Sequence, residues 1–88
     1  MSDMTVVLVA SVFAAALAIA IGGYGPARAL GEALKQGLDS MARQPESSAQ
    51  IMRTLFVGMA LIESIAIYAF VITLIILFAN PLIDLIAR

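Results

Sequence analysis

Glu63 is the residue of this sequence whose position most strongly indicates chemistry. It is the only residue charged at neutral pH in the stretch LFVGMALIESIAIYAFVITLIILFA, residues 55–79. A helix that crosses a membrane needs about 20 apolar residues, and this stretch provides them. Placing a charged side chain at the centre of a membrane costs about 2.5–3.5 kcal/mol on insertion scales. We therefore expect Glu63 to serve the function of the protein.

Two hydroxyl groups lie close to Glu63. Ser64 follows it directly, and Tyr68 lies four residues beyond Ser64, on the same face of a helix. Their oxygen atoms offer hydrogen-bond partners to both forms of a carboxyl group. Because removal from water penalises the charged form, the carboxyl is expected to be neutral in lipid and to ionise beside water or a cation. Such a group is a reversible ion carrier; the alternative is a polar residue that only joins helices.

The composition indicates a protein that lives in lipid. The 88 residues are 62% hydrophobic and 12% charged, whereas a soluble protein has about 25% charged residues. Cys and His are absent, which excludes disulfides, thiolate or imidazole metal sites and His acid–base chemistry. A net charge of −1 argues against a nucleic-acid partner. No cationic residue precedes the first apolar run, so we expect that run to be retained as structure.

Two uncharged runs, at residues 4–27 and 55–79, frame the only charged stretch. Apolar residues recur every three or four positions through much of that stretch, which indicates that the first helix continues past the membrane. The predicted fold is an all-α membrane protein, a single-domain transmembrane hairpin of two helices over residues 1–88. We expect a first helix at about residues 4–42, a polar loop at 43–47, a second helix at about 48–79 and an apolar tail at 80–88.

Prolines set the predicted ends of the helices. Pro45 cannot continue a helix and favours an extended residue before it, and Pro81 ends the second helix in the same way. Ser47 and Ser48 follow the break and offer side-chain oxygens that could cap the second helix.

Small residues occupy every second position of the first helix near Pro26. A turn centred near residues 44–45 would place Glu63 of the second helix at the level of Pro26. Two helical residues turn about 200°, so alternate members of this series fall on opposite sides. Small residues let helices approach closely in lipid. Two opposed small faces suit a helix packed between identical neighbours in the inner wall of a homo-oligomeric ring; the alternative is an ordinary dimerisation face. One face comprises Gly23, Ala27 and Gly31, and the other Gly25 and Ala29.

These patterns closely resemble the c subunit of F-type ATP synthases, the proteolipid of the rotor ring. The resemblance covers nearly the whole chain: the glycine-rich residues 23–31, the loop at 42–46, the Glu63-Ser64-x-x-x-Tyr68 pattern and the terminal residues 78–81. It implies a ring of identical subunits in the bacterial inner membrane, without catalytic activity of its own and without a cofactor. It also implies that Glu63 exchanges an ion with half-channels of a neighbouring a subunit.

The resemblance further implies that Arg43, Gln44 and Pro45 contact the gamma and epsilon subunits of the central stalk. Four of the five Lys and Arg residues lie on the loop side of the hairpin. The excess of cationic residues there predicts a cytoplasmic loop with both termini outside. These residues are Arg28, Lys35, Arg43 and Arg53.

The transported ion is predicted to be H⁺, with Na⁺ as the alternative. Sodium-binding relatives have a Gln or Glu four residues after the proline and a Thr two residues after the key Glu; here Leu30 and Ile65 stand there. Na⁺ needs several oxygen ligands, whereas a proton needs one carboxylate and one acceptor. The remaining oxygen ligands would come from the side chains of Glu63 and Ser64 and the carbonyl of Leu61. Tyr68 still matches the sodium pattern.

Glu32 is a second acid on the first helix. It lies two residues beyond Leu30, about 200° around the helix, and should not reach the same site unless the helices shift in register. This acid and the substituted glycines are similar to the divergent N-type branch of the bacterial enzymes.

Two further classes of protein compete with the rotor subunit. A small pore-forming hairpin such as a phage holin also has two spans and a charged turn, but it needs neither a lone central Glu nor a two-faced series of small residues. A structural membrane subunit that only holds its partners together is the third possibility.

Overall fold

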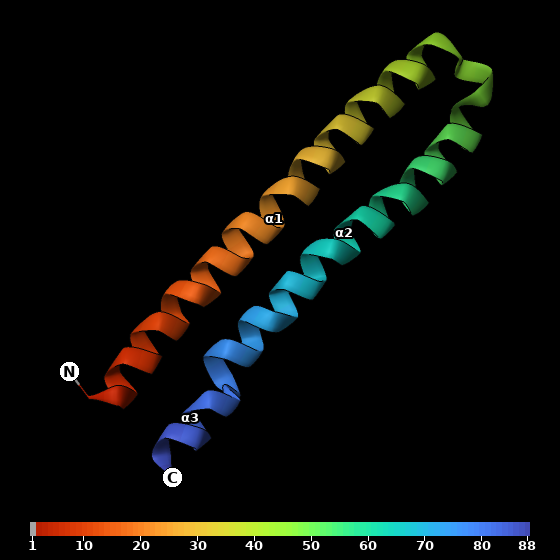
Figure 1. The fold of residues 1–88 in the computed structure, drawn as a ribbon. Helices are drawn as coiled ribbons and strands as arrows, with labels where there is room; N and C mark the ends of the chain where they lie inside the picture. Colours follow the sequence, from red (N-terminus) through yellow and green to blue (C-terminus); the bar gives the residue numbers. More distant parts are fainter. Residues whose placement is uncertain (1) are drawn as a thin grey trace.

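The computed structural model describes residues 2–88 as a long helical hairpin (Figure 1). Helices α1 (Asp3–Arg43) and α2 (Ser48–Phe78) run antiparallel and side by side, joined by the short 3₁₀ helix η1 (Pro45–Ser47). A third helix, α3 (Pro81–Ala87), follows α2 at the open end of the hairpin and contacts α1. The predicted all-α hairpin is confirmed, and the apolar C-terminal tail is helical.

The hairpin buries very little of its apolar surface. It measures 65 × 17 × 10 Å, which is the thickness of two packed helices, and Ala15 is the one buried hydrophobic residue among those described. Large side chains such as Phe56 and Phe78 are 75% and 81% exposed. Two helical segments are long and apolar enough to cross a membrane. Lipid and neighbouring protein must therefore cover the surface that a soluble protein would turn inward.

The turn is built from backbone hydrogen bonds. Pro45 begins η1, and the N–H of Ser47 donates to the carbonyl of Gln44 at 2.9 Å. The prediction that serine side chains cap α2 is wrong: Ser47 is the N-cap residue but makes no side-chain hydrogen bond to the helix. A capping side chain needs an extended backbone, whereas Ser47 has φ −103° and ψ 4° because it closes the 3₁₀ turn.

Two glycines that were not in the predicted small faces bring α1 and α2 together. A Cβ atom built on Gly22 would lie 2.8 Å from the Cβ of Ala69, and one on Gly37 would lie 2.5 Å from a terminal methyl of Leu55. At Gly22 only glycine leaves room for the partner helix, because the Cβ of Ala69 is fixed to its backbone; at Gly37 the close atoms belong to the flexible end of Leu55, which can move aside. Pro26 lies inside α1 and leaves the carbonyl of Gly22 without its usual helical partner, yet α1 continues through it.

The Gly22–Ala69 contact fixes the register of the hairpin. Glu63 lies six residues from Ala69 towards the turn and is therefore level with Arg28, six residues from Gly22. This is within one helical turn of the predicted level at Pro26, displaced towards the loop. The displacement arises because α1 continues to Arg43 and η1 precedes α2, so the turn is centred beyond residues 44–45.

Polar groups join the helices at the open end. The hydroxyl of Thr73 lies 3.4 Å from the carbonyl oxygen of Ala15 and 2.8 Å from that of Ala69 in its own helix. The side-chain amide of Asn80 donates to the hydroxyl of Ser11 at 2.8 Å, while its oxygen accepts from the first turn of α3. Asn80 therefore both ties α2 to α1 and caps α3.

Replacing Gly22 with Ala is expected to destabilise the hairpin by about 1–3 kcal/mol, the usual cost of overpacking. The new methyl group would meet the Cβ of Ala69, which cannot rotate away. We would measure unfolding of the dissociated hairpin in detergent by circular dichroism. Gly25→Ala is the matched control, because a Cβ there meets nothing within 4 Å. Equal stability of the two variants would contradict the close contact between the helices.

Candidate ion-binding site

Glu63 lies near the middle of α2 and faces an open, apolar pocket. Leu30 of α1 lines this pocket together with Phe56, Met59, Ala60 and Glu63 of α2. The structure thus brings Leu30 of α1 into the same pocket as Glu63. Phe56, Met59, Ala60 and Leu30 contribute only apolar side chains, so the protein surroundings of the carboxyl are poor in oxygen.

Ser64 uses its proton within its own helix. Its hydroxyl donates to the carbonyl oxygen of Leu61 at 2.6 Å, a common arrangement for Ser in a membrane helix. The hydroxyl oxygen therefore presents only its lone pairs to other groups. Within residues 2–88, no hydrogen bond joins the side chain of Glu63 to Ser64, Tyr68 or Leu61. Of the predicted site groups, the structure joins Ser64 to Leu61 directly.

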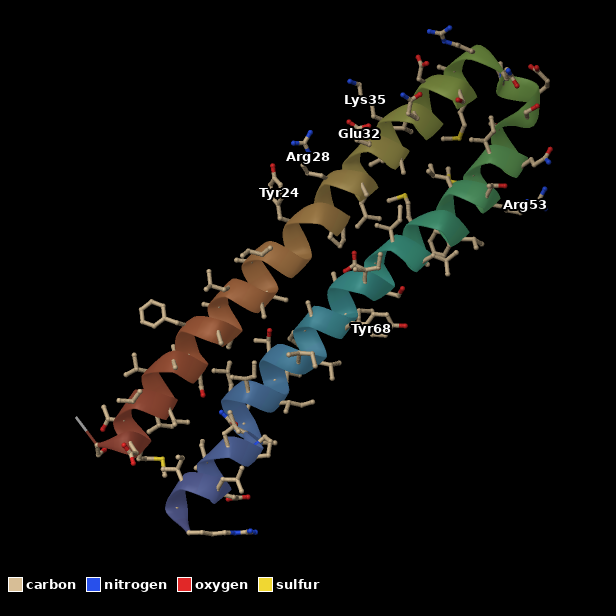
Figure 2. The ribbon with its side chains drawn as sticks, viewed as in Figure 1. Tyr24, Arg28, Glu32, Lys35, Arg53 and Tyr68 are labelled. Atoms are coloured by element: carbon tan, nitrogen blue, oxygen red, sulfur yellow. The ribbon has the colours of Figure 1, made fainter. Side chains whose placement is uncertain are left out.

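Tyr68 points away from α1. Its side chain is 70% exposed and projects from the outer side of α2 (Figure 2). Within one hairpin, the phenol of Tyr68 therefore does not lie between the two helices and does not cover the carboxyl group of Glu63. Its hydroxyl is available to lipid or to a neighbouring copy of the chain.

Glu32 lies on the far side of α1 from the site. Figure 2 shows its side chain projecting away from α2, and it does not line the pocket of Glu63. Although the register differs from the predicted one, this second acid lies on the side of α1 that faces away from α2. The expectation that Glu32 stays apart from the site holds within the hairpin.

The two predicted small faces are not used within the hairpin. Cβ atoms built on Gly23, Gly25 and Gly31 would meet nothing within 4 Å, and Ala27 and Ala29 are exposed. The glycines that contact α2 are Gly22 and Gly37 instead. Both small faces are therefore open to other helices.

The loop lies at the end of the hairpin remote from Glu63 (Figure 1). Arg43, Gln44 and Pro45 are exposed there. The guanidinium of Arg43 forms an ion pair with Asp39 one turn earlier, with an N–O distance of 3.1 Å. An exposed pair of this kind contributes about 0.2–0.5 kcal/mol to a helix, so it leaves Arg43 able to exchange partners.

Two apolar helices with one carboxyl group in the second span define the chain as a membrane proteolipid. Comparison with known proteins gives the family. The model of the family described as the C subunit of ATP synthase matches residues 13–76, which is most of the hairpin including the turn and Glu63. The chain belongs to this family of ATP synthase c subunits.

Several known proteins support this assignment. The ATP synthase c subunit numbered 2 of Cereibacter sphaeroides is 51% identical over 75 residues, which cover 85% of this chain and 90% of that protein. The c subunit numbered 1 of the ATP synthase of Pelobacter propionicus is 50% identical over 74 residues, 84% of this chain and 81% of its own length. The ATP synthase c subunit of Thermosynechococcus vestitus is 51% identical over 72 residues, 82% and 88% of the two chains.

The predicted resemblance is thereby confirmed. As a member of this family the chain is a non-catalytic membrane subunit of an ATP synthase, and copies of it form the rotor ring. Its two apolar helices place it in a membrane. This role is distinct from those of a pore-forming hairpin and of a subunit that only holds partners together.

Proposed function

We propose that Glu63 carries H⁺ and so couples proton flow to rotation of the ring. The observation that carries this proposal is the oxygen-poor pocket that Leu30 of α1 lines together with Glu63. A bound proton needs no ligand shell: it forms a covalent bond to one carboxyl oxygen and one hydrogen bond to an acceptor. Ser64, whose own proton is committed to Leu61, is such an acceptor on the neighbouring residue.

Na⁺ is the second candidate, favoured by Ser64 and Tyr68. A hard cation must exchange its hydration shell for several oxygen ligands. In the hairpin, the carbonyl of Leu61 already accepts from Ser64, and the phenol of Tyr68 points outward. A neighbouring copy would have to supply the missing oxygen atoms. The hairpin therefore supports the proton more directly than the sodium ion.

The carrier works by alternating between two environments. A neutral, protonated Glu63 can face lipid, and an ionised Glu63 can face an aqueous half-channel or a cationic group. We propose that the a subunit of the synthase provides these half-channels. One charge moved across 100 mV of membrane potential is worth about 2.3 kcal/mol, and this energy drives rotation in one direction.

We also propose that the exposed loop of Arg43, Gln44 and Pro45 contacts the gamma and epsilon subunits of the central stalk. The loop is the one end of the hairpin without a chain terminus (Figure 1). It lies on the side that holds four of the five cationic residues, which supports a cytoplasmic loop and outer termini in a bacterial inner membrane.

Labelling with a hydrophobic carbodiimide tests the assignment of Glu63 and of the ion. The reagent attacks protonated carboxyl groups, so Glu63 should be modified selectively in the assembled ring, and faster at lower pH. Added Na⁺ should not slow the reaction near neutral pH. We would locate and time the modification by mass spectrometry. Equal labelling of Glu32, Asp39 and Glu63 would contradict a unique carrier, and protection by millimolar Na⁺ would overturn the proton assignment.

Leu30→Gln is the matched variant for this measurement. It adds a side-chain oxygen on α1 in the pocket of Glu63. We expect carbodiimide labelling of this variant to become sensitive to Na⁺, whereas the unmodified ring stays insensitive. Ile65→Thr, on the exposed side of α2, should have a smaller effect.

A further inference from the structure

Three charged side chains lie on the side of α1 that faces away from α2. Figure 2 shows Arg28, Glu32 and Lys35 projecting in that direction, and all three are exposed. In the described part of the chain, the only ion pair joins Arg43 to Asp39. Glu32 and Lys35 therefore do not form an ion pair with each other within the hairpin, although they are three residues apart on one helix.

Glu32 and Lys35 lie at the edges of different small faces of α1. Lys35 follows Gly31 by four residues, so it lies about 40° around the helix from this member of one small face. Glu32 follows Gly25 by seven residues, so it lies about 20° from this member of the other small face. The ammonium group and the carboxylate of one copy therefore lie towards opposite neighbours.

A ring brings these two edges together. In a closed ring each copy presents one surface to one neighbour and a different surface to the other. If the copies pack through their small faces, Glu32 of one copy and Lys35 of the next border the same interface. The copies of a ring lie at the same height, so the two residues differ in level by three positions, about 4.5 Å. With helix axes about 8–10 Å apart, their Cα atoms are about 9–11 Å apart, a separation that Glu and Lys side chains together can span.

We propose that Glu32 of each copy forms an ion pair with Lys35 of the next copy, which gives a closed belt of ion pairs around the ring. The partner is a second copy of this chain, and the complementary charges at the edges of the two small faces support it. Arg28 stays outside the pair, because its guanidinium donates to the phenol oxygen of Tyr24 at 3.4 Å.

The belt would fix the height of each copy relative to its neighbours. A copy that moves along the ring axis separates its carboxylate from the neighbouring ammonium group on one side and its ammonium group from the carboxylate on the other. The ion pairs therefore oppose this movement. As a result, they keep Glu63 of every copy at one level of the membrane.

The test is a direct coupling of the two groups in assembled rings, held in mild detergent. A water-soluble carbodiimide activates a carboxyl group, and an adjacent amine then displaces the urea and forms an amide bond. Lys35 is the only lysine of the chain. We expect dimers and longer multiples on denaturing gels, and mass spectrometry of peptide fragments should find Glu32 joined to Lys35. Single chains alone on the gel would overturn the proposal, even if an amide bond joined the two residues within one copy.

Two neutral variants identify the carboxyl group that reacts. Glu32→Gln rings should still assemble, because the small faces provide the packing, but the linked multiples should be lost. Asp39→Asn is the matched control: it removes an acid from the same half of α1, one whose carboxylate is already paired with Arg43. Its linked multiples should remain. Multiples that persist in Glu32→Gln and disappear in Asp39→Asn would refute the pair.

Exchange of the two charges gives a second, independent measurement. Glu32→Lys places like charges at every interface, so its rings should dissociate at a lower temperature than unmodified rings when heated and run on gels. Glu32→Lys/Lys35→Glu restores opposite charges and should recover the stability of the ring. An unchanged dissociation temperature in Glu32→Lys, or no recovery in the exchanged variant, would contradict the belt. Labelling of Glu63 by the hydrophobic carbodiimide in the same rings reports separately on the proton carrier.

Discussion

A ring built entirely from Glu63→Gln copies is expected to assemble and yet to support no ATP synthesis. Gln has nearly the volume of protonated Glu and is neutral, so the pocket beside Leu30 accepts it. It has no proton to exchange at physiological pH and cannot ionise when it meets a half-channel. During each turn of the ring, every copy passes the half-channels in sequence. Because no copy can exchange an ion there, rotation stops completely.

We would measure proton-driven ATP synthesis in vesicles that hold the reconstituted synthase, together with ring mobility on gels. The rate should fall to that of vesicles without the enzyme. Glu32→Gln is the matched control: it removes an acid from the side of α1 that faces away from the site, and most of the activity should remain. ATP synthesis above background with Glu63→Gln would show that another group carries the ion.

The hairpin and its carboxyl group follow from simple contrasts in the sequence. Glu63 is conspicuous because 24 apolar or uncharged residues surround it, and Pro45 marks the turn because it cannot continue a helix. Both inferences depend on local composition alone. They therefore do not require knowledge of how the two helices meet.

The contact between the helices could not be predicted in the same way. Neighbouring residues of a helix differ in direction by about 100°, so Gly22 faces α2 while Gly23 is open. Which glycine makes the contact depends on the rotation and register of α1, and these depend on the backbone of the turn. The 3₁₀ geometry at Ser47 moves the register and also removes the predicted side-chain cap.

The site likewise combines features that follow from local sequence with features that depend on how the two helices meet. The hydrogen bond from Ser64 to Leu61 is local and follows from the tendency of Ser to bond to the preceding turn of its helix. The placing of Leu30 beside Glu63 follows from the fold. The orientation of Tyr68, which points outward, was not evident from its spacing to Ser64.

Ala27→Leu is expected to prevent ring formation while leaving the hairpin folded. Ala27 is exposed, and its small face makes no contact with α2, so a larger side chain does not disturb the α1–α2 packing. In a ring the same side chain meets the adjacent copy. Overpacking costs about 1–3 kcal/mol at each site, and a closed ring incurs this cost at every interface. The result should be a loss of rings or a changed number of subunits.

Circular dichroism would report on the hairpin, and gel mobility with imaging would report on the ring. Ala87→Leu is the matched control, since Ala87 is an exposed alanine at the end of α3, outside both small faces. An unchanged ring in Ala27→Leu would show that this face of α1 does not pack against a neighbour.

A second variant decides whether both small faces are used. Ala29 lies on the other face of α1 and is also exposed. In a ring each copy contacts its two neighbours through different surfaces, so Ala27→Leu and Ala29→Leu should both disrupt assembly. In a two-fold dimer one surface meets its own copy, and only one of the two substitutions should matter. Disruption by both, with the Ala87→Leu ring intact, therefore requires a helix held between two neighbours.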